Sequence, residues 1–419
     1  MHRSLPERPG AHGRTPSRPG PGRARTGASD GAAISAIALG LLATPTALSA
    51  NATTMTLPDI ARDIGVSVST ATWLATVFGL AVAVSTPLTA ALLRHRGVRV
   101  AVLTSAALVA VGTLTVALAE SMPGLLAGRA AQALGGSGFV TTAITLAGTP
   151  RRMAVITAGS GMCGALGPLS GSLLTDGLSW HVALALSAVA LLAVPHVARR
   201  APTPRPRTDG TAFDGVGAAL SVALICSLVL LARFPVPALT GTAVLGATLA
   251  LWVRRRPDGF LPVAVLRSPV FLPVAGVVCA LSTAYFAILY TVPRLLEDDA
   301  GWDAVDIGVG SLVALLVGSA ASWGMAAHAH RMGRSAALAV LLTLGVLAPV
   351  TAAAGSAPGP WLAAAGVAVF VAASGQAILA LVAGGAVPER QRTTALGLFT
   401  LCYQLGGAFG PAIAALLLA

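Results

Sequence analysis

Residues 159–172 read GSGMCGALGPLSGS and lie inside a longer run of apolar residues. Five of these fourteen positions are glycine and one is proline. Inside a helix, a glycine costs about 1 kcal/mol relative to alanine, and a proline costs about 3 kcal/mol. A helix with so many weakening residues must gain something from its smooth surface. Its apolar surroundings indicate where that gain arises.

The composition is that of a membrane protein. The chain has 419 residues, of which 55% are hydrophobic and 10% are charged, and its mean hydropathy is +0.81. A soluble protein of this size could not cover so much apolar surface. Apolar blocks alternate with short polar joints, and a bilayer core about 30 Å thick needs roughly 20 apolar residues per helix. The predicted fold class is therefore an all-α, polytopic membrane protein.

Thirteen apolar blocks are predicted to cross the membrane. The seventh and eighth are the closest pair, because only residues 233–237 separate them. The predicted spans are 32–54, 69–93, 98–118, 122–147, 153–175, 180–197, 214–233, 238–253, 268–291, 307–327, 335–353, 360–385 and 393–418.

The arginines predict the orientation of these spans. All 27 basic residues are arginine, and a cytoplasmic N-terminus places most of them in the tail and the cytoplasmic loops. The outer loops then hold only Arg62, Arg233 and Arg294, as the positive-inside rule requires. The net charge of +12 therefore reports topology, and nucleic-acid binding is not expected. We expect a multi-pass protein of the plasma membrane.

Carboxylates and thiols give no sign of a metal site or a cofactor. None of the 15 acidic residues falls in the middle of a predicted span. His328 and His330 have no third ligand nearby in sequence. Four cysteines without CxxC spacing lie within apolar spans, where we expect buried free thiols: Cys163, Cys226, Cys279 and Cys402.

Two short motifs occur twice in the same order. GALGP at 164–168 returns as GAFGP at 407–411, which is 243 residues later. RHRGVR at 94–99 is echoed by HRMGR at 330–334, whose glycine lies 236 residues later. Each copy is predicted to lie on the same side of the membrane as its partner. The pattern indicates a parallel duplication with two helices inserted between the halves.

The duplication predicts how the chain is divided. The sixth helix of the first half has no counterpart after residue 418, so the second half is expected to lack its last helix. A truncated gene, a genuine thirteen-helix protein or a miscounted pair at 214–253 would explain this. The predicted segments are a disordered basic cytoplasmic tail (1–31), an N-terminal six-helix bundle (32–198), a cytoplasmic linker (199–213), an inserted helix pair (214–256) and a C-terminal bundle (257–419).

On these motifs, residues 32–419 resemble the major facilitator superfamily, and most of all its fourteen-helix drug:proton antiporter branch. GSGMCGALGPLSGS resembles the glycine-rich fifth-helix motif centred on GPxxGG. LLAGRAAQALGG (125–136) resembles the fourth-helix motif, in which glutamine follows arginine by three residues. WLATVFGLAVAVSTPL (73–88) resembles the second helix, and FDGVGAAL (213–220) resembles the start of the inserted pair.

The resemblance implies a two-bundle secondary active transporter that exports amphiphilic small molecules or drugs by alternating access, with proton-coupled antiport. Its implied partners are a small-molecule substrate, protons or another coupling ion, and the lipid bilayer, and we expect a monomer. The chain has no HExxH, no GxSxG and no Walker lysine, so an enzyme is not expected. The alternatives are a non-transporting or truncated remnant, and a facilitator-type importer or exporter of a metabolite or lipid.

Three positions lack an aspartate that the antiporter branch carries. Arg94, and His330 in the second copy, stand where the branch carries an aspartate before Arg-x-Gly-Arg. Ser49 stands where the first helix of the branch usually has an aspartate. Proton coupling in this family is tied to membrane carboxylates. These departures therefore weigh against proton antiport, whereas the glycine motif favours it.

The glycine-rich helix is the first candidate for a functional site. Its glycines recur at spacings of three and four, so they share one helix face. We hypothesise that this face packs against a helix of the other half and gates the cavity; ordinary close packing is the alternative. Proline permits a bend in such a helix. The gating set comprises Gly161, Gly164, Gly167, Pro168, Gly171, Gly407, Gly410 and Pro411.

Arg129 is the only charge placed within a predicted span. An arginine at mid-bilayer costs about 2.5–3.5 kcal/mol on insertion scales. The resemblance favours a fixed charge that serves coupling or binds a substrate group. Gln132 lies one turn further on the same face and could orient the guanidinium. The alternative is a side chain that snorkels to the outer interface.

Two further groups of residues are weaker candidates. The cytoplasmic gate loops contribute Arg94, Gly97, Arg99, His330, Gly333 and Arg334. Polar and aromatic groups within spans are candidates for the cavity wall: Asn51, Trp73, Phe78, Tyr285, Gln376 and Tyr403. Aromatic walls with few polar groups suit bulky apolar substrates, although ordinary packing explains each of these residues equally well.

Overall fold

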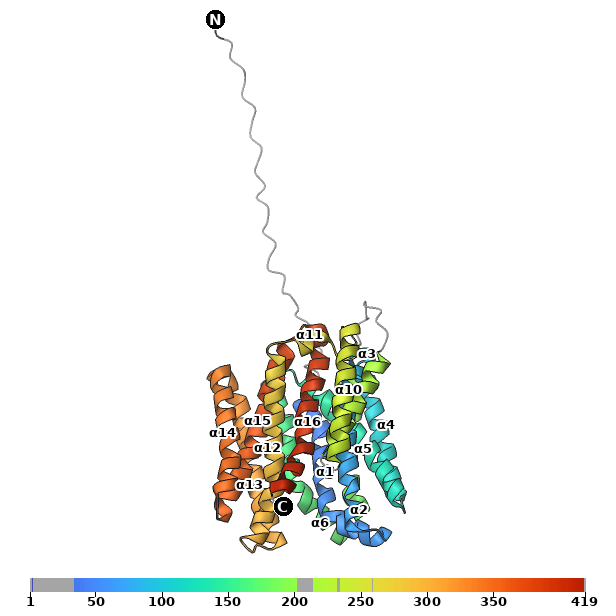
Figure 1. Ribbon diagram of the computed structural model, residues 1–419, viewed down its shortest axis with the longest axis vertical. Coiled ribbons are helices and arrows are strands. Elements are labelled where there is room, and N and C mark those ends of the chain that lie inside the picture. The colour runs from blue at the N-terminus through green and yellow to red at the C-terminus, as the bar shows by residue number, and fades with distance from the viewer. Residues whose placement is uncertain (1, 3–33, 202–213, 232–233, 258, 418–419) are drawn as a thin grey trace.

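The computed structural model describes residue 2 and residues 34–201, 214–231, 234–257 and 259–417. The predicted tail, apart from residue 2, and most of the predicted linker lie outside the described residues. Within the described ranges the regular structure is helical, without strands. The helices run side by side as long rods, with α11 at one end of the bundle and α2 at the other (Figure 1).

The first group of helices, which we call the first set, runs from α1 to α8. Two of its members, α4 and α5, have the bounds that the sequence predicts. The elements are α1 (Ala36–Ile64), α2 (Val68–Ala71), α3 (Trp73–Arg96), α4 (Val98–Leu118), α5 (Met122–Ala147), α6 (Pro150–Gly177), α7 (Trp180–Leu184), the 3₁₀ helix η2 (Ala185–Ala193) and α8 (Val194–Arg199).

The remaining helices form a hairpin and a second set. The hairpin is α9 (Gly215–Leu230) and α10 (Pro235–Arg255), followed by the short α11 (Val263–Leu266). The second set is α12 (Phe271–Asp298), α13 (Ala304–Met332), α14 (Arg334–Ala354), α15 (Pro358–Gly385) and α16 (Arg392–Leu417), with the 3₁₀ turn η3 (Glu389–Gln391) before α16.

Several helices begin at a capping side chain. The Ser35 hydroxyl accepts a hydrogen bond from the Ala38 amide at the start of α1, and Thr149 does the same at the start of α6. The Asp303 carboxylate accepts from the amides of Val305 and Asp306 at the start of α13. Such side chains satisfy amide groups that have no partner within the helix.

Helix α1 is longer than its predicted span. It continues to Ile64, ten residues beyond the predicted end at residue 54, and stops where Gly65 adopts a left-handed conformation (φ 73°). This last part contains Asp59, Arg62 and Asp63, so its charges end the apolar run before the helix itself ends. Glycine is the usual residue for such a helix terminus.

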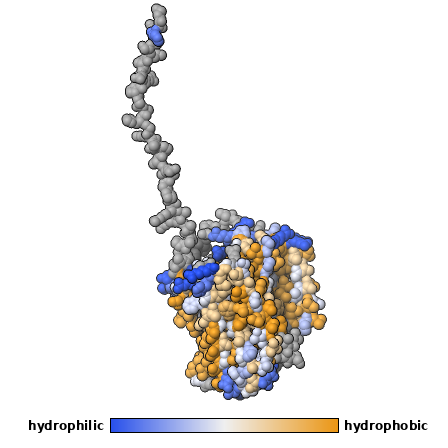
Figure 2. All heavy atoms as spheres, turned by 90° about the vertical axis from the view of Figure 1, so that its left-hand side faces the viewer, coloured by the Kyte–Doolittle hydropathy of each residue, from blue (hydrophilic) through white to orange (hydrophobic). Residues whose placement is uncertain are grey.

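The surface of the bundle matches a membrane-embedded protein. Within the described residues, ten helices are long and apolar enough to cross a membrane, and α9 is a shorter apolar helix. Polar residues gather at the two ends of the rods, with an apolar band between them (Figure 2). The remaining two of the thirteen predicted spans correspond to α5 and α16, which are each 26 residues long. Their crossing of the membrane stays a prediction.

The two sets meet along two seams that have the same design. In each set the second long helix packs against the fifth long helix of the other set. One seam is therefore formed by α3 and α16, and the other by α6 and α13. Helix α15 also contacts α6 at the second seam. This exchange is what a parallel duplication would produce.

Backbone geometry also repeats between the sets. Gly97 separates α3 from α4 with φ 83° and ψ 176°, and Gly333 separates α13 from α14 with φ 74° and ψ 156°. This region of backbone space is essentially restricted to glycine. Helices α4 and α14 begin 236 residues apart, at Val98 and Arg334, as do α5 and α15. The repeated glycine of the two loops thus has one structural role in both copies.

The inserted hairpin lies on the first seam. Helix α9 packs against α10, against α3 of the first set and against α16 of the second set. Ile225 and Val229 of α9 form a buried apolar cluster with Ala83 of α3 and Leu401 of α16. The hairpin therefore bridges the two sets at one seam, and we find no corresponding element described at the other.

Candidate functional site

Helix α5 brings Arg129 into the interior of the first set. The side chain is fully buried, with 0% of its surface exposed. Its NH1 group donates to the Ser49 hydroxyl and to Gln132 Oε1, both at 3.0 Å. Its NH2 group donates to the Ser49 carbonyl at 3.2 Å and to the Thr53 hydroxyl at 2.6 Å. The guanidinium therefore joins α5 to α1 through three hydrogen bonds and makes a fourth within α5, and snorkelling to an interface does not describe it.

A second layer holds the residues that bind Arg129. Gln132 is also fully buried, and its Nε2 donates to the Thr113 hydroxyl at 3.1 Å and to the Leu184 carbonyl at 3.2 Å. The Ser49 hydroxyl donates to the same Leu184 carbonyl at 3.3 Å. Leu184 lies where α7 meets η2, so the sixth predicted span contributes a backbone oxygen to the network. Gln132 is thus hydrogen-bonded to the arginine one turn along the same helix, and its predicted orienting role stays a prediction.

All of these hydrogen-bond acceptors are neutral. In the part of the chain that the structure describes, the only salt bridge joins Arg62 and Asp59 on the surface. The Arg129 Nε also lacks a hydrogen-bond partner among the described residues. The Phe78 ring lies under the guanidinium, 4.5 Å from its central carbon. A desolvated cation–π contact contributes about 2 kcal/mol, much less than the cost of burying an isolated charge.

The glycine-rich helix α6 does not present one face to the other set. A Cβ atom at Gly161 would lie 2.5 Å from the Ser319 hydroxyl of α13, so Gly161 does lie on the second seam. A Cβ atom at Gly167 would instead lie 2.5 Å from the Asn51 Cβ of α1, and one at Gly171 would lie 2.4 Å from the Ala52 carbonyl.

The predicted packing of this face is therefore correct at Gly161 and wrong at Gly164 and Gly167. The Asn51 amide donates to the Gly164 carbonyl at 2.9 Å, within the first set. Gly161 faces α13, whereas Gly159, Gly164, Gly167 and Gly171 face α1 and allow it to approach closely. Pro168 lies inside α6, between these contacts.

The second copy of the motif repeats this arrangement within the second set. A Cβ atom at Gly410 would lie 2.5 Å from the Phe286 Cβ of α12, and one at Gly407 would lie 3.5 Å from the Phe286 ring. Phe286 thus takes the place that Asn51 has in the first set. Pro411 lies in α16, and its side chain is outside the described part of the structure. Whether either copy gates transport stays a prediction.

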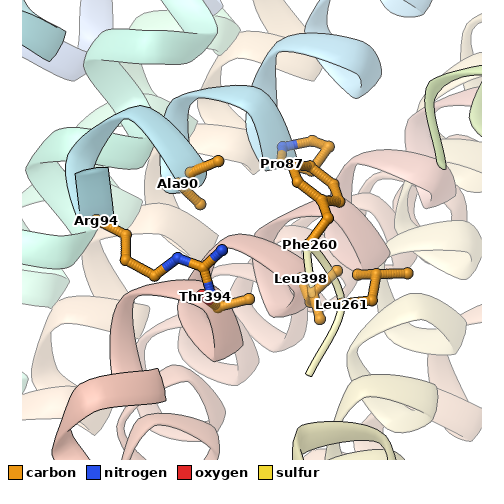
Figure 3. A pocket seen from close by; sticks show the side chains of 8 residues that line it. Pro87, Ala90, Arg94, Phe260, Leu261, Thr394 and Leu398 are labelled. Atoms are coloured by element: carbon orange, nitrogen blue, oxygen red, sulfur yellow. The ribbon is translucent and has the colours of Figure 1, made fainter. Parts of the chain in front are cut away.

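The predicted gate loops lie at the end of the bundle where α3 ends and α4, α6 and α16 begin. We call this the arginine-rich end. Arg94 lies beside Thr394 of α16 and Phe260 of the loop after α10 (Figure 3). Arg99 is exposed at the start of α4. The side chains of His330 and Arg334 are outside the described part of the structure.

The candidate cavity residues are placed in several different environments. Phe78 lies against Arg129, and Trp73 packs into an apolar cluster at the other end of α3. The Tyr285 and Tyr403 rings flank Phe286, at centroid distances of 4.8 Å and 6.4 Å. Gln376 is 8% exposed within α15. The structure thus brings together an aromatic group from α12 and α16, separate from the polar network around Arg129.

A groove of about 630 Å³ lies between α13 and α15. Its lining is entirely apolar and includes Val313, Val317 and Phe370. None of the six candidate cavity residues lines it. A hollow at the arginine-rich end is much smaller and is the one shown in Figure 3. Within the described residues, no three His, Cys, Asp or Glu side chains come together as metal ligands would.

Sequence reasoning missed two groups of residues. Ser49 was noted only for the aspartate it replaces, and Thr53 was not singled out, yet both bind Arg129. Asp214 was also missed: its carboxylate accepts from Gly217 N at 2.9 Å, Phe260 N at 3.0 Å and Trp252 Nε1 at 3.0 Å. An aspartate just before an apolar run is a helix-capping signal, which could have identified it.

Hydrogen bonding governs the ionisation of Asp214. Partial burial raises its pKa, but the hydrogen bonds from Phe260, Gly217 and Trp252 and the nearby Arg256 charge more than offset this. The pKa therefore lies below its ordinary value, and the group is a carboxylate at neutral pH.

Comparison with known proteins agrees with the observed fold. A crystal structure of the human organic anion transporter MFSD10 (TETRAN) aligns with a TM-score of 0.62 at 19% identity, covering 92% of this chain and 93% of that one. The uncharacterized MFS-type transporter YvkA of Bacillus subtilis (strain 168) is 24% identical over 320 residues, which are 72% of this chain and 70% of the relative.

Two further relatives match over shorter stretches. A chloramphenicol resistance protein of Streptomyces lividans is 36% identical over 147 residues, which are 32% of this chain and 36% of the relative. An aspyridones efflux protein of Neocamarosporium betae is 26% identical over 241 residues, which are 50% of this chain and 42% of the relative. The sequence model of the Major Facilitator Superfamily matches residues 37–411. With its two interlocked helix sets, repeated motifs and buried fourth-helix arginine, the chain belongs to the Major Facilitator Superfamily of membrane transporters.

Proposed function

We propose that this protein is a secondary active exporter of amphiphilic small molecules that works by alternating access in the plasma membrane, with its arginine-rich end in the cytoplasm. The observation that best supports this proposal is that the two seams are built in the same way. Each seam is a contact between the second and fifth long helices of opposite sets, so rocking one set against the other opens one end as it closes the opposite end.

The export direction draws on two relatives, whose names describe chloramphenicol resistance and efflux of aspyridones. Export by this chain is the simplest activity that agrees with both. The arrangement of side chains supports an amphiphilic substrate, because the first set holds a polar group around Arg129 and the second set holds an aromatic group around Phe286, the counterpart of Asn51. Aromatic side chains suit apolar parts of a ligand, and a cation suits an acidic part.

Coupling to a proton gradient is the second part of this proposal. The glycine motif on α6 and α16 favours antiport by its resemblance to antiporter sequences. Arg129 has only neutral hydrogen-bond partners, so a proton site would have to lie elsewhere. Asp59, Asp63 and the acidic residues at 297–306 are the candidates at the opposite end of the bundle.

The test is proton movement in inverted membrane vesicles that contain this protein. A pH-sensitive dye reports whether the acidified interior becomes more alkaline when a lipophilic cation, an antibiotic or an amphiphilic anion is added. We expect alkalinisation with at least one of these compounds and none with the Arg129→Ala variant. A parallel assay of compound uptake separates transport from coupling.

Uptake without alkalinisation would contradict proton coupling while keeping the transporter. No uptake of any compound, with the protein verified as inserted, would contradict export of amphiphilic molecules.

A further inference from the structure

The loop after α10 returns the chain to the first seam. Phe260 in this loop is only 3% exposed and forms a buried cluster with Ala91 of α3 and Ala218 of α9. The same ring faces a small hollow that Thr394 and Leu398 of α16 also line (Figure 3). Phe260 therefore lies where the first set, the second set and the inserted hairpin meet.

Helices α3 and α16 approach each other closely beside Phe260. A Cβ atom at Gly397 of α16 would lie 2.3 Å from the Ala90 Cβ of α3, so only a glycine fits there. Ala90 and Thr394 are 2% and 7% exposed. The two helices are thus in direct contact at the arginine-rich end, and Phe260 lines a small hollow beside this contact.

The loop is tied down by one carboxylate. Asp214 Oδ2 accepts the Phe260 amide at 3.0 Å, while the same side chain accepts from Gly217 at the start of α9 and from Trp252 near the end of α10. A Cβ atom at Gly259 would lie 2.4 Å from Asp214 Oδ2, so the backbone passes directly over the carboxylate. The hairpin therefore helps to hold Phe260 in this position through Asp214.

We propose that Phe260 is a positioning residue of the gate at the arginine-rich end: its ring, held by Asp214, stabilises the closed contact between α3 and α16. This rests on the proposed alternating access, which requires these helices to separate. When they separate, Phe260 no longer shares a small hollow with Thr394 and Leu398 of α16. The inserted hairpin then supports Phe260, which acts as a latch, meaning a contact that keeps the two sets closed against each other.

The experiment measures how fast a water-soluble maleimide labels a cysteine inside the seam. Thr394→Cys is the reporter, in full-length protein whose four native cysteines are replaced by alanine, with the reagent on the arginine-rich side. Ser335→Cys, at an exposed position at the same end, verifies insertion and reagent access. Labelling needs no substrate, so it is independent of the transport assay.

We expect the Phe260→Ala variant to raise the labelling rate of the reporter about tenfold. A tenfold change in the open population corresponds to about 1.4 kcal/mol, which is less than truncation of a buried phenylalanine usually costs. Phe260→Leu, which keeps most of the apolar volume, should restore a rate near that of the parent. Phe234→Ala is the matched control, because Phe234 is an exposed ring at the far end of the same hairpin.

Asp214→Asn provides a second variant that leaves the Phe260 ring in place. It should also speed labelling, by a smaller factor, because the loop is held less firmly. Unchanged labelling in both Phe260→Ala and Asp214→Asn would overturn the inference, even if transport is found. Faster labelling without transport of any compound would support the latch and count against the proposed export.

Discussion

The same helix crossing is built in two ways in the two sets. Between α3 and α5, the Phe78 ring lies against the buried Arg129 guanidinium. The counterpart of Phe78 in the second set is Ala314, which lies 236 residues later. There α13 crosses α15, and a Cβ atom at Gly366 would lie 3.0 Å from the Ala314 carbonyl. The counterpart of Arg129 is Ala365, which lies in an apolar cluster.

This comparison separates what the duplication kept from what it changed. Helix positions, loop glycines and the close approach of the fifth helix to the first are common to both sets. The buried charge and its hydroxyl partners occur in the first set, while in the second set aromatic rings surround Phe286, the counterpart of Asn51. The two sets therefore share their helix arrangement but differ in the polar and aromatic side chains that they carry.

The largest expected effect comes from filling the space that both sets keep. Gly167→Leu and Gly410→Leu each force a side chain into α1 or α12, where the nearest atoms include backbone. We expect loss of transport from either change and a loss of stability of about 1–3 kcal/mol or more. Gly177→Leu is the control, because nothing lies within 4 Å of a Cβ atom there. Normal transport by Gly167→Leu, measured as compound uptake, would contradict the shared role.

Removing the charge that only the first set has should separate activity from stability. Arg129→Met deletes a buried cation whose partners are neutral, so the cost of burying the charge is recovered as its hydrogen bonds are lost. We expect transport to fall at least about tenfold, while the free energy of unfolding changes by only about 1 kcal/mol. Compound uptake and thermal unfolding in detergent test this. A strongly destabilised but active variant would reverse the interpretation.

Adding a carboxylate beside Arg129 tests the same difference between the two sets. Ser49→Asp places an anion beside Arg129, whose NH1 lies 3.0 Å from the present hydroxyl. A hydrogen bond to a charged group contributes about 1.5–3 kcal/mol, so the variant should unfold at a higher temperature at pH 8. The matched change Ala284→Asp, at the corresponding position of α12, has no such arginine and should destabilise. Equal effects in the two sets would contradict the comparison.

A smaller effect is expected where the first set carries an amide. Asn51→Leu removes a hydrogen bond of 2.9 Å to the Gly164 carbonyl and should cost about 1 kcal/mol. Phe286→Leu, at the corresponding place in the second set, removes ring contacts with Tyr285 and Tyr403 instead. We expect the first change to affect polar substrates more and the second to affect aromatic ones, measured by competition between two compounds.

The smallest effect concerns pH at the hairpin that touches both sets. Because the pKa of Asp214 is lowered on folding, the carboxylate stabilises the protein above its unfolded-state pKa, and this stabilisation is lost as the pH falls through the folded-state pKa. Between pH 5 and 8, the stability difference between wild type and Asp214→Asn should therefore stay constant. Thermal unfolding at several pH values checks this, and a difference that changes between pH 6 and 8 would contradict it.

Apolar length predicted most of the helices, because membrane-spanning segments have few ways to satisfy their backbone groups. Helices α4 and α5 match their predicted bounds, since clear polar breaks flank both. The end of α1 was missed, because a helix that leaves the membrane can continue through Asp59 and Arg62 as an amphipathic segment. Helix geometry continues there, although the apolar signal stops.

The candidate site was only partly predictable for a different reason. Spacing identified the smooth face of α6 and the contact between Gln132 and Arg129, because both lie along one helix. Spacing cannot say which neighbour covers that face, and Gly167 proved to contact α1. Ser49 and Thr53 are ordinary hydroxyl residues, 80 and 76 positions from Arg129, so only the packing of α1 on α5 reveals them.

The hairpin on the α3–α16 seam has a consequence for how molecules arrive from the bilayer. A seam that α9 bridges is shielded from lipid on that side, whereas α6 and α13 meet without such cover in the described structure. A compound dissolved in the bilayer would therefore reach the α6–α13 seam directly, but not the α3–α16 seam. The two flanks of this transporter should then differ in permeability, even though the duplication built them alike.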